Sequence, residues 1–273
     1  MSDKKQDLLD ELITFLENER EMYGSFSVSK ITESVQTGSA STEETESTTD
    51  GGTKKIVSNT PESTSKTDSS PTPTSTPLSL EQKLNNCGSL DELKDLCESS
   101  DQLKTDLEGT NLVFGVGNPT ADLMIVGEAP GFNEDQQGEP FVGAAGQLLN
   151  KILKAIVFDR KDIYIANILK HRPPDNRNPT SEERERSLPF LERQIDLISP
   201  KVILCVGKVS GTTLLGKDQA LKNMRGQFYD YRGVKLTVTY HPAALLRNPK
   251  WKRPVWEDVQ AVRKKYDELD GKP

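Results

Sequence analysis

The sequence lacks the features of secreted and membrane proteins. It has only three cysteines, Cys87, Cys97 and Cys205, and their uneven spacing fits a reducing compartment rather than a disulfide framework. It has no run of about 18 apolar residues, the length that a membrane-spanning helix needs. The apolar core of a secretion signal is also missing near the N-terminus. We therefore expect a cytoplasmic protein without membrane contact.

Apolar residues are also scarce, at 33% of the 273 positions. Packed domains contain about 45–50% when glycine is counted, so part of the chain is expected not to pack. Residues 41–80 hold 20 Ser and Thr and no aromatic residue. Such a segment buries too little apolar area to offset the entropy lost when it becomes ordered. We predict a disordered linker over residues 31–80.

An amphipathic helix is predicted before that linker, within residues 1–30. Leucine and isoleucine recur at spacings of three and four in residues 7–23, which gives a helix one apolar face. This face either docks on the protein's own domain or binds a groove of another protein.

Charge is divided unevenly along the chain. Residues 111–273 hold 25 Lys and Arg against 20 Asp and Glu, whereas residues 1–110 hold 10 against 22. The net charge of −7 therefore hides a basic C-terminal part. Because the field at a site depends on nearby charges, the acidic total is compatible with a nucleic-acid partner.

Short apolar runs alternate with helical periodicity after residue 110. The runs are at 123–127, 162–167, 201–207 and 235–240, and helices are expected at 144–156, 181–198, 210–215 and 254–269. Nearly continuous apolar strands are typical of a parallel sheet that is buried on both faces. We predict an α/β fold with three layers, α/β/α, around a central, mostly parallel four-stranded sheet. This domain spans residues 81–273, and residues 81–107 supply one or two further helices.

Residues able to bind a ligand follow three of these four strands. They are a glycine-rich turn from Gly127 to Gly131, Asn167 and His241. Each has a structural alternative: a tight turn or weak phosphate loop, a strand cap, and a helix start. Ligands of open parallel sheets bind beyond the carboxyl ends of the strands, so the shared position favours a binding site.

A basic and aromatic segment adds a second signal. Residues 221–253 hold eight Lys and Arg and a single acid, Asp230, with aromatic residues between them. Basic side chains offset phosphate charge and aromatic rings stack on bases, which favours nucleic-acid binding. The alternative is a solvated surface with a few core aromatics.

Several of these segments resemble, in order and spacing, the motifs of family 4 uracil-DNA glycosylases. The motifs are Val113-Phe-Gly-Val-Gly-Asn-Pro, Leu123-Met-Ile-Val-Gly-Glu-Ala-Pro-Gly, Pro140-Phe-Val-Gly, Asn167-Ile-Leu-Lys-His-Arg-Pro-Pro-Asp-Asn-Arg, Arg225-Gly and His241-Pro-Ala-Ala-Leu-Leu-Arg-Asn-Pro. The resemblance covers about residues 110–268. It implies a hydrolase that cleaves the N-glycosidic bond of uracil in DNA, the first step of base-excision repair. We also expect a monomer.

The resemblance also implies roles for single residues in the recognition of the base. Phe141 would stack on the flipped uracil, Asn167 would read its amide edge, and His241 would donate to a uracil oxygen. Gly127 and Ala129 would lie against the base and the attacking water.

Other roles concern the water and the DNA. Either Glu128 or Glu134 would position the water or stabilise the sugar cation. The residues implied to contact DNA, some from a loop that enters the duplex, are Arg172, Arg225, Leu245, Leu246, Arg247 and Asn248.

The resemblance fails at the cofactor. Members of this family usually hold a [4Fe–4S] cluster on four cysteines, and the matching positions here are Ser100, Leu103, His171 and Ser187. With too few thiolates, we expect no cluster, no other metal and no other cofactor. Packing of residues 81–107 is then expected to hold the region that the cluster would staple.

Two other functions are compatible with the sequence. One is a non-catalytic relative that binds uracil-containing or abasic DNA. The other is a nucleotide-binding α/β domain that uses Gly127–Gly131 as a phosphate loop. The second is disfavoured because no Gly-Lys-Ser/Thr follows these glycines.

Overall fold

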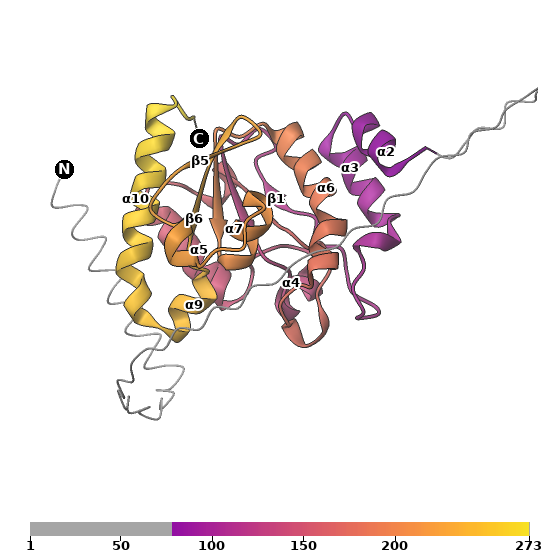
Figure 1. Ribbon diagram of the computed structural model, residues 1–273, viewed down its shortest axis with the longest axis horizontal. Coiled ribbons are helices and arrows are strands. Elements are labelled where there is room, and N and C mark those ends of the chain that lie inside the picture. Colours follow the sequence, from indigo (N-terminus) through magenta and orange to yellow (C-terminus); the bar gives the residue numbers. More distant parts are fainter. Residues whose placement is uncertain (1–77, 273) are drawn as a thin grey trace, which may run out of the picture. The chain divides into compact units, whose positions relative to one another are not determined.

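The computed structural model of the protein describes residues 78–272. The predicted helix at 7–23, and the linker apart from its last residues, lie outside the described residues. The elements in chain order (Figure 1) are α2 (Leu80–Asn86), α3 (Leu90–Glu98), η1 (Asp101–Leu103), β1 (Val116–Gly117), β2 (Leu123–Gly127), α4 (Phe132–Gln137), α5 (Ala144–Ala155), η2 (Arg160–Asp162), β3 (Tyr164–Asn167), η3 (Pro174–Asn176), α6 (Ser181–Ile198), β4 (Val202–Val206), α7 (Lys208–Leu215), α8 (Leu221–Met224), β5 (Tyr229–Tyr231), β6 (Val234–Thr239), α9 (Pro242–Arg247), η4 (Pro249–Trp251) and α10 (Lys252–Glu268).

The sheet contains the four predicted strands and two more at its edges. Its order is β1-β3-β2-β4-β6-β5. The inner strands β3, β2, β4 and β6 pair in parallel, while β1 and β5 pair antiparallel with β3 and β6. The edge strands were not predicted because two and three residues are too short to show a periodic pattern.

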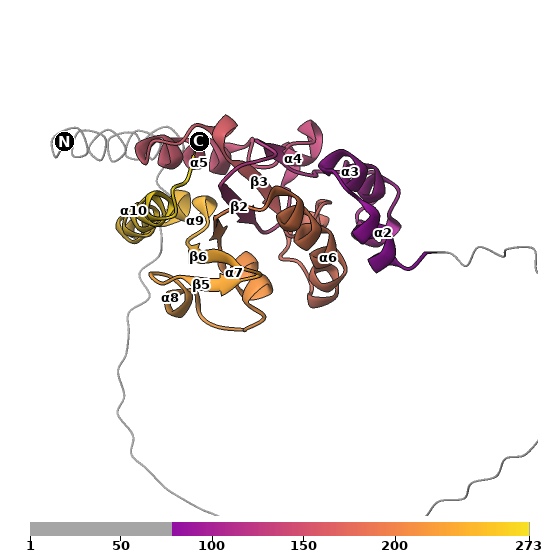
Figure 2. The same cartoon turned by 90° about the horizontal axis from the view of Figure 1, so that it is seen from above.

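Helices cover both faces of the sheet, which confirms the predicted α/β class (Figures 1 and 2). Alternation along β2 sends Leu123 and Ile125 into a core with α5 and α10. Met124 and Val126 point the other way, into a core with α6 and α7. All residues of β2, β3 and β4 are buried, as expected for strands covered on both faces.

A further helical layer lies outside α6. The short helices α2 and α3 and the turn η1 pack on α6 through a separate apolar cluster of Leu84, Cys87, Leu93, Cys97, Leu103, Phe114 and Phe190. Helix α6 is therefore buried on two sides, with Leu191 and Ile195 toward the sheet and Phe190 toward this layer. This arrangement agrees with the expected packing of residues 81–107.

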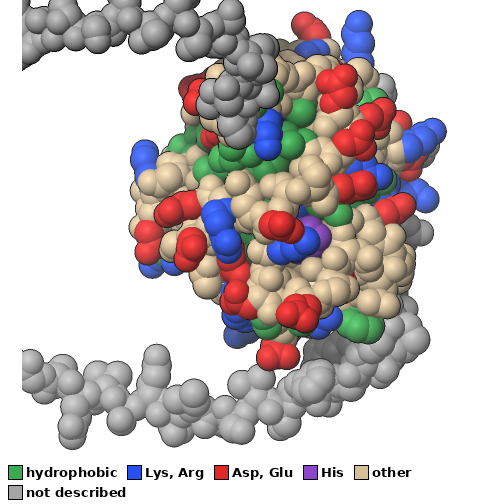
Figure 3. Space-filling view, turned by 90° about the vertical axis from the view of Figure 1, so that its right-hand side faces the viewer, with side chains coloured by type: hydrophobic (Ala, Val, Ile, Leu, Met, Phe, Trp, Pro, Cys, Tyr) green, Lys and Arg blue, Asp and Glu red, His purple; other side chains and the backbone are tan. Residues whose placement is uncertain are grey.

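The outer face of this layer carries acidic and basic side chains next to one another, with no broad area of one sign (Figure 3). In the described part of the chain, every helix is too short or too polar to cross a membrane.

Candidate active site

The carboxyl ends of the parallel strands bring the predicted site residues to one edge of the sheet. Gly127 at the end of β2 pairs in register with Asn167 at the end of β3. The end of β4, Val206, pairs with Thr239 at the end of β6, shortly before His241. The parallel pairing that was predicted from the apolar runs therefore explains why Gly127, Asn167 and His241 lie at the same edge of the sheet.

Asn167 and Phe141 lie against Gly127, and His241 lies against Phe141. A Cβ atom on Gly127 would lie 2.2 Å from Asn167 Oδ1 and 2.7 Å from two ring atoms of Phe141. The Phe141 ring stacks with the His241 ring at a centroid distance of 5.5 Å and an interplanar angle of 27°. These side chains are close enough to contact one small heterocycle, and we call this arrangement the slot.

The carboxamide of Asn167 has an unused acceptor. The residue is 2% exposed, and its Oδ1 atom has no hydrogen-bond partner. Leaving a buried acceptor unpaired costs about 1–3 kcal/mol, so such atoms call for a functional explanation. An N–H group of a ligand in the slot would satisfy it.

Lys170 fixes the backbone of Asn167, a role that the sequence analysis missed. Its ammonium is fully buried and donates to the carbonyl oxygens of Asn167 at 3.0 Å and Phe114 at 3.2 Å, and to Gln194 Oε1. Burial lowers the pKa of Lys170 to about 8. The three acceptors favour the charged form, because they match the three donors of an ammonium. A lysine in a basic loop gives no sequence signal of such burial.

Phe141 adopts a strained backbone conformation. Its φ is +54°, in the left-handed region that bulky residues seldom occupy. Arg160 donates to its carbonyl oxygen at 3.2 Å and also to the carbonyl of Pro140. Gly146 allows this backbone to approach, since a Cβ there would lie 1.8 Å from the same Phe141 oxygen. In the sequence Arg160 is indistinguishable from a surface arginine.

Glu134 connects α4 to the Phe141 segment. Its Oε1 atom accepts from the backbone N–H groups of Val142 and Gly143, both at 3.0 Å. Its Oε2 atom accepts from Gly131 N–H at 3.2 Å, which leaves one lone pair on that oxygen. The carboxylate is therefore held beside the slot by three backbone donors.

Glu128 and Ala129 directly follow β2. Ala129 packs against the cluster on the α6 side of the sheet. Glu128 is partly buried, which raises the pKa of its carboxyl, while Arg184 at the start of α6 acts against that rise. The two candidate carboxylates thus have different surroundings.

His241 is held as a neutral hydrogen-bond donor. It caps α9, with Nδ1 accepting from the backbone N–H of Ala243 at 3.1 Å, so the proton of the neutral ring is on Nε2. Burial lowers its pKa from the usual 6.5 to about 4; Arg247 adds to this effect and Glu134 opposes it. A neutral ring with its proton on Nε2 can donate one hydrogen bond without acting as an acid.

The segment predicted to be a duplex-entering loop is mostly helical. Leu245, Leu246 and Arg247 belong to α9. Leu245 is 2% exposed and packs in the core with α5 and α10, so its assignment as a DNA-contacting residue is wrong. Leu246 is 39% exposed, while Asn248 follows the helix and caps η4.

The two predicted DNA-binding arginines have different contacts. Arg225 donates to both carboxylate oxygens of the buried Asp258, at 2.9 and 3.0 Å, which is typical of a structural ion pair. Arg172 lies over the ring of Phe132, 5.0 Å from its centroid, and its Nε donates to Asn176 at 2.7 Å.

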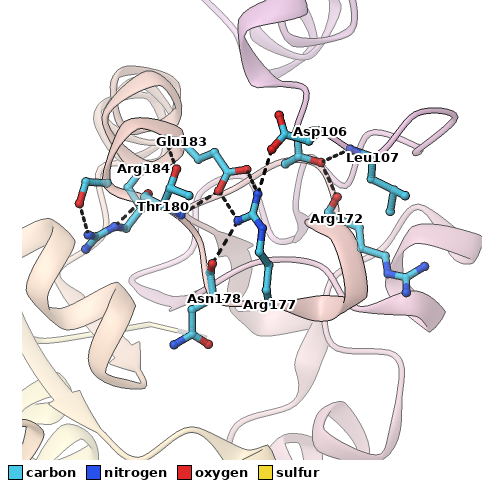
Figure 4. Close-up of polar contacts among 10 residues, drawn as sticks. Asp106, Leu107, Arg172, Arg177, Asn178, Thr180, Glu183 and Arg184 are labelled. Atoms are coloured by element: carbon cyan, nitrogen blue, oxygen red, sulfur yellow. Dashed lines mark hydrogen bonds and ion pairs between the residues drawn. The ribbon is translucent and has the colours of Figure 1, made fainter.

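Polar contacts fix the segment that carries Arg172 (Figure 4). Arg177 makes two hydrogen bonds of 2.8 Å with Glu183 at the start of α6, and contacts Asp106 at 3.4 Å. The hydroxyl of Thr105 donates to the carbonyl oxygen of Arg172 at 2.6 Å. The segment is therefore bonded both to α6 and to residues 105–106.

The positions implied for a [4Fe–4S] cluster do not fit one. Leu103 is an apolar core residue, Ser100 and Ser187 offer neutral hydroxyls, and His171 Nδ1 shares a hydrogen bond with a threonine. Clusters bind thiolates, whereas burial raises the pKa of all three thiols, that of Cys97 to about 12. Across residues 78–272, no group of three or more His, Cys, Asp or Glu is placed to hold a metal.

Comparison with known proteins gives consistent matches. The chain is 42% identical over 184 residues to a type-4 uracil-DNA glycosylase of Archaeoglobus fulgidus, covering 64% of this chain and 89% of the relative. It is 41% identical over 184 residues to the type-4 enzyme of Sulfurisphaera tokodaii, covering 64% and 84% of the two chains. The model of the uracil DNA glycosylase superfamily matches residues 114–260, which include every residue of the slot. The chain therefore belongs to the uracil-DNA glycosylase superfamily.

Proposed function

We propose that this protein is a uracil-DNA glycosylase, a hydrolase that removes uracil from DNA and starts base-excision repair. Water replaces the base at the sugar carbon, so the products are free uracil and an abasic site. The observation that carries the proposal is the slot, in which an aromatic ring, a carboxamide with an unpaired oxygen and a neutral imidazole lie together.

Recognition of the base uses Phe141 and Asn167. A base inside a duplex is inaccessible, so it must leave the stack and enter the slot. There its ring lies against Phe141, and an amide N–H of uracil satisfies Asn167 Oδ1. Lys170 and Arg160 hold the backbones of these two residues, so the slot is formed before the base enters.

His241 assists departure of the base. As the glycosidic bond breaks, negative charge accumulates on the uracil oxygens, and the Nε2–H of His241 donates to one of them. A fixed neutral dipole can stabilise this charge without transferring its proton. The hydrogen bond from Ala243 keeps the ring in the required tautomer.

A carboxylate supports attack by water on the cationic sugar. Glu134 is the better placed candidate because its carboxylate is bonded beside Phe141 and keeps a free lone pair. Glu128 is the second candidate. Replacing each by Gln separates them, since only the residue that orients the water should lower kcat with little effect on KM.

We also propose that the enzyme works without an iron–sulfur cluster. The apolar side chain of Leu103 and the protonated thiols support this proposal. The measurement is the iron content and the visible absorbance of protein purified without air. Stoichiometric iron with the brown colour of a cluster would contradict it.

An excision assay tests the function itself. A labelled oligonucleotide with one uracil is incubated with the protein and then treated with alkali, which cleaves at abasic sites. We expect a cleaved strand from the uracil substrate and none from the matched cytosine control. An uncleaved strand at high protein concentration would contradict the proposed catalytic function.

The remaining proposals concern the whole chain: a monomer, a cytoplasmic location, a linker at 31–80, and a protein partner for the helix at 7–23. Sedimentation tests the monomer. The partner is tested by comparing which proteins bind to the full chain and which bind to a chain that lacks residues 1–30.

A further inference from the structure

Phe132 leaves a large apolar side chain on the surface beside the slot. It is 56% exposed and is the first residue of α4. The same helix carries Glu134, which is bonded to Val142 and Gly143 next to Phe141. Exposed apolar residues are common on protein surfaces, so it is the position of Phe132 that needs explanation.

Arg172 is held over this ring. Its guanidinium carbon lies 5.0 Å from the ring centroid, and its Nε is bonded to Asn176. The contacts in Figure 4 fix its backbone, and its side chain extends away from them. No hydrogen bond within residues 78–272 uses the terminal nitrogens of Arg172, which are therefore available to an anion.

The other exposed apolar side chains and the aromatic residues of the basic segment lack this combination. Val157 is 76% exposed but follows α5, at the edge of the sheet away from the slot. Tyr240 and Trp251 stack on each other, with centroids 4.7 Å apart and an angle of 9°, and both rings are partly buried, whereas Phe132 is exposed. Within the described part of the chain, Phe132 is the only aromatic among the large exposed apolar residues.

We infer that Phe132 and Arg172 bind one nucleotide that neighbours the target in the same DNA strand, with its base stacked on the ring and its phosphate on the guanidinium. This inference rests on the proposed function. Bases stack on aromatic rings with little regard to sequence, and arginine pairs well with phosphate. A base stacked on Phe132 has left its neighbours, so the site binds single-stranded DNA better than duplex.

The test removes the ring and the base separately. Single-stranded oligonucleotides with one uracil are prepared with an abasic tetrahydrofuran at each neighbouring position in turn. For the wild type, the abasic substitution at one of these positions should lower kcat/KM about tenfold. Phe132→Ala should lower kcat/KM on the intact strand by a similar factor. The kcat/KM of this variant should not fall further on the strand that lacks that base. Phe132→Leu, which keeps the apolar surface without the ring, should behave like Phe132→Ala.

Arg172 has its own readout. Arg172→Gln should reduce the slope of log kcat/KM against log salt by about 0.7, the value for one phosphate contact on a single strand. Val157→Ala is the matched control, because it removes an exposed apolar side chain far from the slot, and it should leave the abasic profile unchanged.

Two results would overturn the inference: equal kcat/KM for Phe132→Ala and the wild type on the intact strand, or the same abasic profile for both. If the wild type releases no uracil at all, the proposed function fails instead. The same oligonucleotides then test the stacking site by fluorescence anisotropy, because binding does not require the chemistry.

Discussion

The unpaired oxygen of Asn167 shows how a single residue can favour binding at a cost in stability. Asn167→Ala removes the proposed base reader, and we expect at least a ~100-fold fall in the rate of uracil release, about 2.7 kcal/mol of barrier. The same change removes a buried acceptor without a partner, so stability should not fall as it does for most core truncations. Single-turnover kinetics and urea unfolding measure both effects.

The control for Asn167 is Asn85→Ala, which alters an exposed asparagine of α2 and should retain the wild-type rate. Unchanged activity of Asn167→Ala would mean that another side chain reads the base.

His241 makes stability depend on pH in a defined direction. An unfolded histidine takes up its proton near pH 6.5, whereas burial delays this to about pH 4 in the folded protein. Between these values the unfolded state binds more protons, so the contribution of His241 to stability is present above pH 6.5 and is lost as the pH falls toward 4. Below that value both states are protonated, and no more is lost.

The measurement is the difference in Tm between the wild type and His241→Asn, a variant that keeps a residue able to cap α9. As the pH falls from 6.5 to 4, the Tm of the wild type should fall relative to the Tm of His241→Asn. Groups present in both proteins, His171 among them, cancel in the difference. A Tm difference that is constant across this range would show that His241 is not buried as a neutral ring.

At the scale of elements, the turn between α4 and α5 depends on a side chain from η2. Arg160 bonds the carbonyls of Pro140 and Phe141, and Phe141 has a backbone conformation that costs about 1–3 kcal/mol. Arg160→Met should therefore destabilise the protein by about 1–3 kcal/mol. It should also lower kcat/KM roughly 10- to 100-fold, because small displacements of a positioning group are costly.

Lys161→Met is the matched control for Arg160, since it removes a neighbouring exposed cation. Denaturant unfolding and excision kinetics are measured on both variants. If they behave alike, loss of positive charge and not loss of the carbonyl bonds explains the effect.

The sequence predicted those elements that have a clear period. Three of the four inner strands are nearly continuous apolar runs, and α6 was placed at 181–198 because its apolar positions recur over its length. The edge strands escaped detection since they are too short. Helix α9 was taken for a loop because six residues give less than two turns of pattern, and only the packing of Leu245 shows which side is buried.

The approach of Gly127, Asn167 and His241 was predictable because they follow strands whose ends meet, whereas the role of Phe141 came only from the family resemblance. The residues that support the slot were not predictable, since Lys170 and Arg160 act through backbone carbonyls distant in sequence. The number of basic residues in 221–253 also overstates the positive charge that can contact DNA. Arg225, Arg232 and Lys235 of the basic segment pair with acidic residues, which lowers the positive charge available to DNA.

For the whole molecule, we expect the layer formed by α2 and α3 to be needed for stability, and residues 1–77 to be dispensable for catalysis. A chain without residues 1–77 retains the capping box of Ser79 that starts α2, and should keep the wild-type kcat/KM. A chain without residues 1–99 loses four members of the apolar cluster, including Leu93, and exposes Phe114 and Phe190. We expect it to unfold at a much lower temperature or to be insoluble.

Leu93→Ala tests the same layer in a full-length chain. Truncating this fully buried side chain should cost about 2–5 kcal/mol, which lowers the Tm by several degrees. Because the proposed packing needs no metal, a chelator should leave the Tm of wild type and variant unchanged. A Tm that falls with chelator would show that a metal, and not the apolar cluster, holds this region. Normal stability of the chain without residues 1–99 would show that the layer is dispensable.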